Sequence, residues 1–277
     1  MENSDNLNGE YGFKVLIDEM KVRGYSRKTI ETYEYINKTF LAKIKKSPKD
    51  INKKDINGYL VSLYDKDKAS ATRHLVCSAL KFYYETVLKR RFNLRHPKKS
   101  NKLSAVLAKD EILKMISTSR NPKHRLLIEL MYGSGLRVSE AVKIKIEDFD
   151  VERKVLLIRS GKGGKDRHAN LSERFIEDFI RYAKNKSGYL FESSIRHGMH
   201  ISARTAESVV KNALRKTGIG KRAYCHTLRT SYATHLIENG VDISYVQKLL
   251  GHSRLSTTQA YIRLGQDSIR KVKSPLD

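Results

Sequence analysis

A polar and basic segment, Arg95 to Lys102, divides this sequence into two parts that each carry apolar residues at helical spacing. The segment contains Pro97, which lacks a backbone N–H group and therefore tends to interrupt regular structure. At 277 residues the chain is long enough for two modest domains, since a domain holds roughly 100–200 residues. We therefore expect an N-terminal domain over residues 1–96, a linker over 97–103 and a second domain over 104–277.

Four stretches within residues 11–92 place apolar side chains three and four residues apart, as on one face of a helix. Gly24 ends the first stretch. The other three begin at residues that suit a helix start: Ser26, Asp55 and Ser70. Serine and aspartate side chains can accept hydrogen bonds from the free N–H groups at such a start. The first part of the chain is therefore predicted to be a four-helix domain.

The second part alternates between helical and strand-like patterns. Helical spacing recurs in six stretches: 109–118, 122–133, 172–186, 202–217, 226–239 and 243–250. Residues 144–150, 154–159 and 166–171 are typical of short strands, and the glycine-rich turn Gly161–Lys165 can join the last two as a hairpin. A further short helix is expected over 257–264. The predicted fold class is mainly α with a small antiparallel sheet, the second domain being α+β.

The net charge indicates a polyanionic partner. Lysine and arginine number 55 against 30 aspartate and glutamate, which gives a formal net charge of +25. Solubility alone needs a magnitude of only about 2–8 for a small domain. Basic residues exceed acidic ones in both parts of the chain, so we expect both to bind double-stranded DNA, whose phosphates release counterions when they are neutralised.

Composition excludes several other protein classes. No apolar run reaches the roughly 18 residues of a membrane-spanning helix. The polar, acidic start Met1–Glu10 is typical of neither a signal peptide nor a transit peptide. Two cysteines, Cys77 and Cys225, are too few for a disulfide framework or a four-cysteine zinc site. We therefore expect a cytoplasmic, nucleoid-associated protein without membrane contact.

Several separate motifs contain six side chains suited to phosphate chemistry: Arg137, Lys162, His226, Arg229, His252 and Tyr261. Arg137 follows a glycine-interrupted helix, and Lys162 lies in the tip of the predicted hairpin. His226 and Arg229 are three residues apart at a helix start, where free backbone N–H groups add positive potential. Each residue alone is typical of an ordinary surface, so only their order and spacing favour a joint anion-binding site.

These motifs resemble those of the tyrosine recombinases, also called the phage integrase family, and in particular its Xer branch. The similarity is strongest from His226 to Tyr261, and the blocks Tyr132–Ile144 and Gly161–Arg167 are similar to two further signatures. It extends over about residues 104–265 and more loosely over the N-terminal part. The resemblance implies a helical SAM-like core-binding domain followed by an α+β tyrosine recombinase catalytic domain.

In that family two arginines bind the reacting phosphate, and the matching residues here are Arg137 and Arg229. Planar guanidiniums can clamp the non-bridging oxygens of a pentacoordinate transition state. Lys162 would be the hairpin lysine that protonates the leaving oxygen, with Lys165 in the same hairpin as the alternative. Glu140 matches an acidic residue that supports the first arginine.

The resemblance makes Tyr261 the nucleophile, whose attack on a DNA phosphate leaves a 3′-phosphotyrosyl link that conserves the bond energy without ATP. His226 and His252 would hydrogen-bond the phosphate or handle the tyrosine proton. In this chemistry, cationic side chains supply the positive charge that a metal ion would otherwise provide, so no metal or other cofactor is expected. Thr230 follows the second arginine where Xer proteins commonly have histidine, and we expect this difference to affect packing rather than activity.

The Xer resemblance implies site-specific recombination through a Holliday junction. It suggests resolution of chromosome or plasmid dimers at a dif-like site, a task of chromosome partition during the cell division cycle. The partners would be double-stranded DNA and further copies of the chain, two on each site and four in a synapse, and an accessory protein is left open. Three alternatives also stay open: a mobile-element or phage integrase, a type IB topoisomerase-like enzyme, and an inactive DNA-binding protein.

Overall fold

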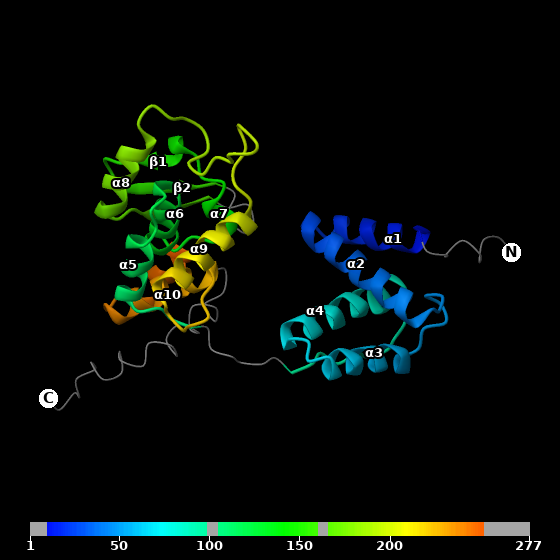
Figure 1. Ribbon diagram of the computed structural model, residues 1–277. Coiled ribbons are helices and arrows are strands. Elements are labelled where there is room, and N and C mark those ends of the chain that lie inside the picture. The colour runs from blue at the N-terminus through cyan, green and yellow to red at the C-terminus, as the bar shows by residue number, and fades with distance from the viewer. Residues whose placement is uncertain (1–9, 99–104, 160–165, 252–277) are drawn as a thin grey trace. The chain divides into compact units, whose positions relative to one another are not determined.

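The computed structural model describes residues 10–98, 105–159 and 166–251 (Figure 1). The chain divides into two compact units, residues 1–102 and 103–277, and the boundary falls within the segment predicted as a linker. The hydrophobic cores of the two units share no residue. Each unit is therefore described by itself.

Within its described part, the N-terminal unit contains four α-helices, the last of which continues as a π-helix. Their bounds are α1 Glu10–Val22, α2 Arg27–Ile44, α3 Lys53–Asp65, α4 Ser70–Lys81 and the π-helix Phe82–Val87. Ser26 caps α2 as predicted, since its hydroxyl accepts a hydrogen bond from Thr29 N–H. Asn52, not Asp55, caps α3. Asp55 lies one turn inside the helix, and its carboxylate accepts a 2.9 Å hydrogen bond from Asn52 N–H while Asn52 Oδ1 accepts one from Asp55 N–H.

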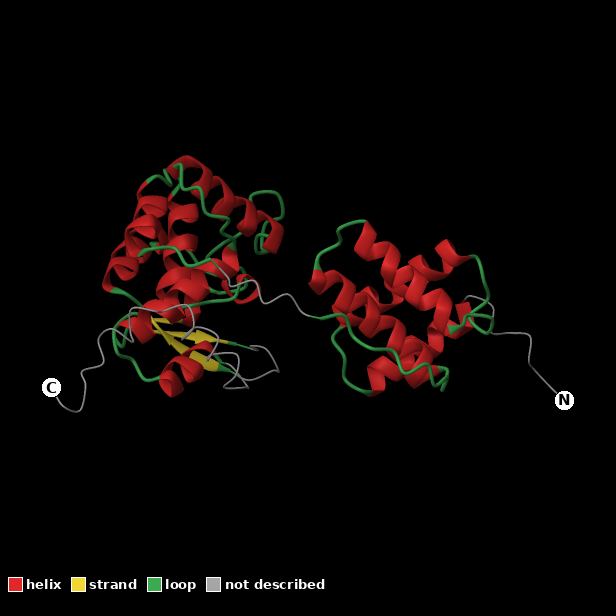
Figure 2. Ribbon diagram, turned by 90° about the horizontal axis from the view of Figure 1, so that it is seen from below, coloured by secondary structure: helices red, strands yellow, loops and turns green. Residues whose placement is uncertain are grey.

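The second unit packs helices beside a small sheet (Figure 2). Its described helices are α5 Lys109–Ser117, α6 Pro122–Gly133, α7 Val138–Ala141, the 3₁₀ turn Ile146–Asp148, α8 Glu173–Ala183, α9 Ala203–Thr217, α10 Cys225–Glu238 and α11 Ile243–Leu250. The antiparallel sheet has the order β1 Phe149–Asp150, β2 Val155–Ile158, β3 Arg167–Asn170. None of the helices described is long and apolar enough to cross a membrane. The prediction of a mainly helical chain with a small antiparallel sheet is confirmed.

The prediction of a strand over residues 144–150 is wrong for most of this range. Of residues 144–150, only Phe149 and Asp150 pair with β2. Lys145 forms an isolated antiparallel bridge with Tyr189, and the strand does not continue because residues 146–148 form a 3₁₀ turn, closed by a 3.0 Å hydrogen bond from Lys145 N–H to the Asp148 carboxylate. Helix α7 was not predicted, because four residues are too few to show a helical period.

Helix α10 is buried along most of its length. It packs against α6, α9 and α11, and its buried residues include the polar Arg229 and Ser231. The Ser231 hydroxyl accepts a hydrogen bond from Leu107 N–H at 2.9 Å, so this polar group is satisfied inside the core. Because a buried helix cannot turn without disturbing the core, side chains at the start of α10 have a fixed place.

Glu129 of α6 is a buried carboxyl group that faces α8. Its Oε1 lies 3.4 Å from Arg174 Nε, and its Oε2 has no hydrogen-bond partner among the described residues. Burial, and then the charge of nearby Asp178, raise the pKa of Glu129 from an ordinary 4.5 to about 7, and Arg174 offsets only part of this effect. Between pH 4.5 and pH 7, the folded unit therefore retains a proton on Glu129 that the unfolded chain has released.

We predict that Glu129→Gln will stabilise the second unit at pH 8 but not at pH 4.5. As pH rises from 4.5 to 7, the unfolded wild-type chain loses a proton that the native state holds, so wild-type stability falls while that of the variant does not. The expected gain is about 1–3 kcal/mol. Hydrogen exchange of α6 amides in urea, at pH 4.5 and at pH 8, measures the free energy of unfolding of both proteins. A difference between variant and wild type that is the same at both pH values would contradict the prediction.

Candidate active site

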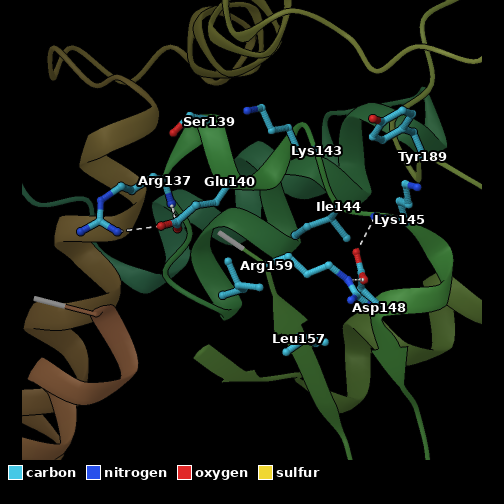
Figure 3. Close-up of a pocket in the computed structure, with 11 residues that line it drawn as sticks. Arg137, Ser139, Glu140, Lys143, Ile144, Lys145, Asp148, Leu157, Arg159 and Tyr189 are labelled. Atoms are coloured by element: carbon cyan, nitrogen blue, oxygen red, sulfur yellow. Dashed lines mark hydrogen bonds and ion pairs between the residues drawn. The ribbon is translucent and has the colours of Figure 1, made fainter. Parts of the chain in front are cut away.

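Arg137 and Glu140 are joined at the start of α7. The Glu140 carboxylate accepts a 2.9 Å hydrogen bond from the backbone N–H of Arg137 and a 2.6 Å bond from Arg137 Nη1. Glu140 exposes 6% of its side chain and Arg137 exposes 23%. A buried carboxylate therefore fixes the direction of a partly exposed guanidinium, and the pair is visible in Figure 3.

Arg229 of α10 is 1% exposed, and its guanidinium is held from two sides. It donates hydrogen bonds to the carbonyl oxygens of Gly135 at 2.7 Å and Leu250 at 2.5 Å. Its Nη1 also lies 3.7 Å from Glu140 Oε2. The structure thus brings the two arginines named by the sequence motifs to one carboxylate.

Arg167, the first residue of β3, completes this group. Its Nη2 donates to Glu140 Oε2 at 2.7 Å, and its Nη1 donates to the Leu249 carbonyl oxygen at 2.6 Å. Sequence reasoning assigned no role to this residue, although it is the last residue of the recognised block Gly161–Arg167. We refer to Arg137, Arg167, Arg229 and Glu140 as the arginine cluster.

The charges of the arginine cluster keep Glu140 ionised. Burial by itself raises the pKa of Glu140, but Arg167 and then Arg137 more than offset burial, so the pKa of Glu140 is lowered. Three guanidiniums around one carboxylate leave an excess of positive charge. Such an excess attracts an anion whose oxygens accept forked hydrogen bonds, and a phosphodiester fits this description.

His226 lies in the first turn of α10, within electrostatic reach of the arginine cluster. The residue is exposed, yet the protein around its ring desolvates it in part; this effect, followed by repulsion from Arg229 and Arg137, lowers the pKa of His226. The imidazole is therefore neutral at neutral pH and can both donate and accept a hydrogen bond. The remaining predicted site residues lie outside the described part of the chain: Lys162, Lys165, His252 and Tyr261.

A groove of about 540 Å³ adjoins the cluster beside Arg137 (Figure 3). The cationic side chains of Lys143, Lys145 and Arg159 line it. Two acidic residues, Glu140 and Asp148, also line it, and both are ion-paired: Glu140 with Arg137, and Asp148 with Arg159, whose Nε donates a 2.7 Å hydrogen bond to it. We refer to this surface as the basic groove, and its charge suits an extended polyanion that passes Arg137.

Two neighbours of the site residues belong to the core. Burial raises the pKa of the Cys225 thiol to about 12, so this thiol is not a nucleophile near neutral pH. Thr230, which replaces the expected histidine, is fully buried. Across residues 10–98, 105–159 and 166–251, no group of three or more histidine, cysteine, aspartate or glutamate side chains could hold a metal ion.

Comparison with known protein families matches both units. The family described as "Phage integrase family" matches residues 105–267, and "Phage integrase, N-terminal SAM-like domain" matches residues 13–94. The tyrosine recombinase XerA of Pyrococcus furiosus is 37% identical over 253 residues, which cover 88% of this chain and 86% of that protein. XerA of Pyrococcus horikoshii is 35% identical over 258 residues, which cover 91% and 88% of the two chains.

Solved structures show the same fold. A crystal structure of XerA recombinase matches with a TM-score of 0.56 and 29% identity, covering 94% of this chain and 96% of that one. A lambda integrase tetramer bound to a Holliday junction matches with a TM-score of 0.76 and 22% identity, covering 99% and 82%. XerH bound to a palindromic difH substrate, in a post-cleavage complex, matches with a TM-score of 0.70 and 23% identity, covering 97% and 90%.

We predict that Gly135→Ala will destabilise the second unit more than Gly218→Ala. Both glycines have positive φ, +59° and +72°, so each substitution strains the backbone by about 1–2 kcal/mol. A Cβ at Gly135 would lie 2.6 Å from Tyr232 Cε1 and 3.0 Å from Leu250 Cδ2, whereas nothing lies within 4 Å at Gly218. The close contacts should cost Gly135→Ala about 1–3 kcal/mol more.

Urea unfolding of the two variants, followed by hydrogen exchange of α10 amides, measures this difference. Gly218→Ala is the matched control because it carries the same backbone strain without the contacts. Equal losses in the two variants would show that the space around Gly135 is not tight.

Proposed function

As a member of the phage integrase family, in the Xer branch of tyrosine recombinases, the chain is an enzyme that transfers DNA strands, and we propose that it does so through a 3′-phosphotyrosyl ester on Tyr261. The Tyr261 hydroxyl gives its proton to His226 or His252, its oxygen bonds to phosphorus as the bond to the 5′ oxygen breaks, and Lys162 protonates the leaving oxygen. Attack by the 5′-hydroxyl of another strand reverses these steps and rejoins the DNA. The ester conserves the bond energy, so the cycle needs no ATP.

The arginine cluster is the observation that carries this proposal. Phosphoryl transfer spreads negative charge over the non-bridging oxygens, and donors that are already oriented stabilise that charge at little further cost. Arg137 is held by Glu140 at the edge of the basic groove, and Arg229 is held by two carbonyl groups. Neutral His226 lies nearby and can hydrogen-bond a phosphate oxygen.

We further propose that the chain acts at a dif-like site, with two copies per site and four in a synapse, and resolves chromosome or plasmid dimers through a Holliday junction. Two structural relatives support this assembly, since XerH was solved on a palindromic difH substrate and lambda integrase as a tetramer on a Holliday junction. Exchange of flanking markers between two sites would distinguish this reaction from relaxation by a type IB topoisomerase-like enzyme.

We predict that Tyr261→Phe will abolish the SDS-resistant adduct with nicked suicide DNA while DNA retention stays unchanged. Phenylalanine keeps the ring but lacks the attacking oxygen. Tyr245→Phe removes the hydroxyl of an exposed tyrosine on α11 and serves as the matched control that keeps the adduct. An adduct formed by Tyr261→Phe would assign the nucleophile to another residue, and no adduct from the wild-type chain would refute strand transfer through tyrosine.

We predict that Lys143→Ala and Lys145→Ala will each weaken binding of duplex DNA and reduce its dependence on salt. Each lysine lines the basic groove, and loss of one phosphate contact should lower the slope of log K against log salt by about 0.9. Lys114→Ala, an exposed lysine on α5 outside the groove, removes the same charge and is the control. Equal slopes for all three variants would show that the groove does not contact DNA.

A further inference from the structure

We propose that Arg167 is a positioning residue of the strand-transfer site. Its side chain joins β3 to the start of α7 and to the end of α11, and it thereby fixes the orientation in which Arg137 and Arg229 face the phosphate. The inference rests on the proposed function, because it assigns Arg167 a part in the same reaction. Arg167 is not one of the residues that touch the DNA phosphate in that proposal. It acts through Glu140 and through the backbone.

The two arms of the Arg167 guanidinium bind two different segments. Nη2 donates to Glu140 Oε2 at 2.7 Å, and Nη1 donates to the Leu249 carbonyl oxygen at 2.6 Å. Only 11% of the side chain is exposed. A planar fork of fixed geometry can hold both acceptors at once, whereas the single ammonium of a lysine is a compact point charge. The contact geometry therefore calls for arginine at this position.

The chain around Arg167 is shaped to receive it. Gly251, at the end of α11, has a φ of +61°, and a Cβ there would lie 2.8 Å from Arg167 Cδ and 3.1 Å from Arg167 Nε. A glycine at this turn thus leaves room for the aliphatic stem of the arginine. In the sequence, the residue after Gly251 is His252, and Lys162 lies five positions before Arg167. Arg167 is therefore attached to the two segments that lead into the other proposed site residues.

Arg167 also sets the charge that Arg137 and Arg229 present. The charged groups that face Glu140 are Arg137 from α7, Arg167 from β3 and Arg229 from α10. Among their charges, that of Arg167 lowers the pKa of Glu140 most, while Arg137 also lowers it through two hydrogen bonds. Without Arg167, that carboxylate would compensate the two remaining arginines alone, and less positive charge would be left for the phosphate.

The experiment compares Arg167→Gln, which removes the charge, with Arg167→Lys, which keeps the charge but lacks the fork. Arg174→Gln is the matched control, because it also removes an arginine that faces a buried glutamate, Glu129, away from the cluster. Single-turnover cleavage of nicked suicide DNA is measured at saturating full-length protein, and half-site affinity is measured separately. All measurements are made below the onset of thermal unfolding.

We expect Arg167→Gln to cleave about 10- to 100-fold more slowly while its half-site affinity changes less than about threefold. Arg167→Lys should recover part of the rate, and Arg174→Gln should cleave within about twofold of wild type. Loss of the Arg167 charge should raise the pKa of Glu140. The acid limb of the profile of cleavage rate against pH should therefore move to higher pH in Arg167→Gln and stay near the wild-type position in Arg167→Lys. A residue that only stabilised the fold would not move that limb.

Wild-type cleavage by Arg167→Gln would overturn the inference. Parallel losses of rate and affinity with an unmoved acid limb would overturn it as well. If Arg167→Gln does not fold, Arg167→Lys decides alone, since a wild-type rate in that variant would show that the fork is not needed. Failure of the wild-type chain to form any adduct would instead refute the proposed function, so the two failures are distinguishable.

Discussion

The buried carboxylate of Glu140 is the group on which the rest of the site depends. It accepts hydrogen bonds from Arg137 and Arg167 and lies 3.7 Å from Arg229, so it links α7, β3 and α10 at one point. Removing one partner from a buried ion pair commonly costs about 3–5 kcal/mol, because the other charge is left uncompensated. The cluster therefore acts as a unit, in which the position of each arginine depends on the others.

The other acceptors of these arginines are backbone carbonyl groups, two of which lie at the end of α11. Leu249 and Leu250 close α11, and Gly135 follows α6. The last carbonyls of a helix have no partner within the helix and carry the negative end of its dipole. Arg167 and Arg229 thus cap the end of α11, and the same hydrogen bonds fix the orientation of their guanidiniums. The backbone thus compensates part of the charge of Arg167 and Arg229, and the cluster needs only one carboxylate and keeps its positive excess.

Local patterns predicted most of the helices but not the arginine cluster. The spacing of apolar residues and a cap such as Ser26 are informative because both act within one or two turns. The same reasoning failed at residues 144–150, where the Asp148 side chain takes a backbone N–H that a strand would have used. Arg167 contacts residues 27 and 82 positions away, and no local pattern encodes such contacts. The other three members were found by resemblance to a family motif, which names residues without showing how they are held.

In the proposed reaction, affinity and chemistry depend on charges in two different environments. The lysines of the basic groove are open to solvent, so salt screens them over roughly 10 Å and their contribution is to binding and to its salt dependence. The arginine cluster is largely buried, and buried charges are screened much less. A phosphate that reaches the cluster supplies the negative charge that its surroundings lack. Because the cost of orienting the arginines is met when the chain folds, that phosphate gains the interaction without paying for their reorganisation. The rate at saturating DNA should therefore depend on the cluster and the affinity on the groove.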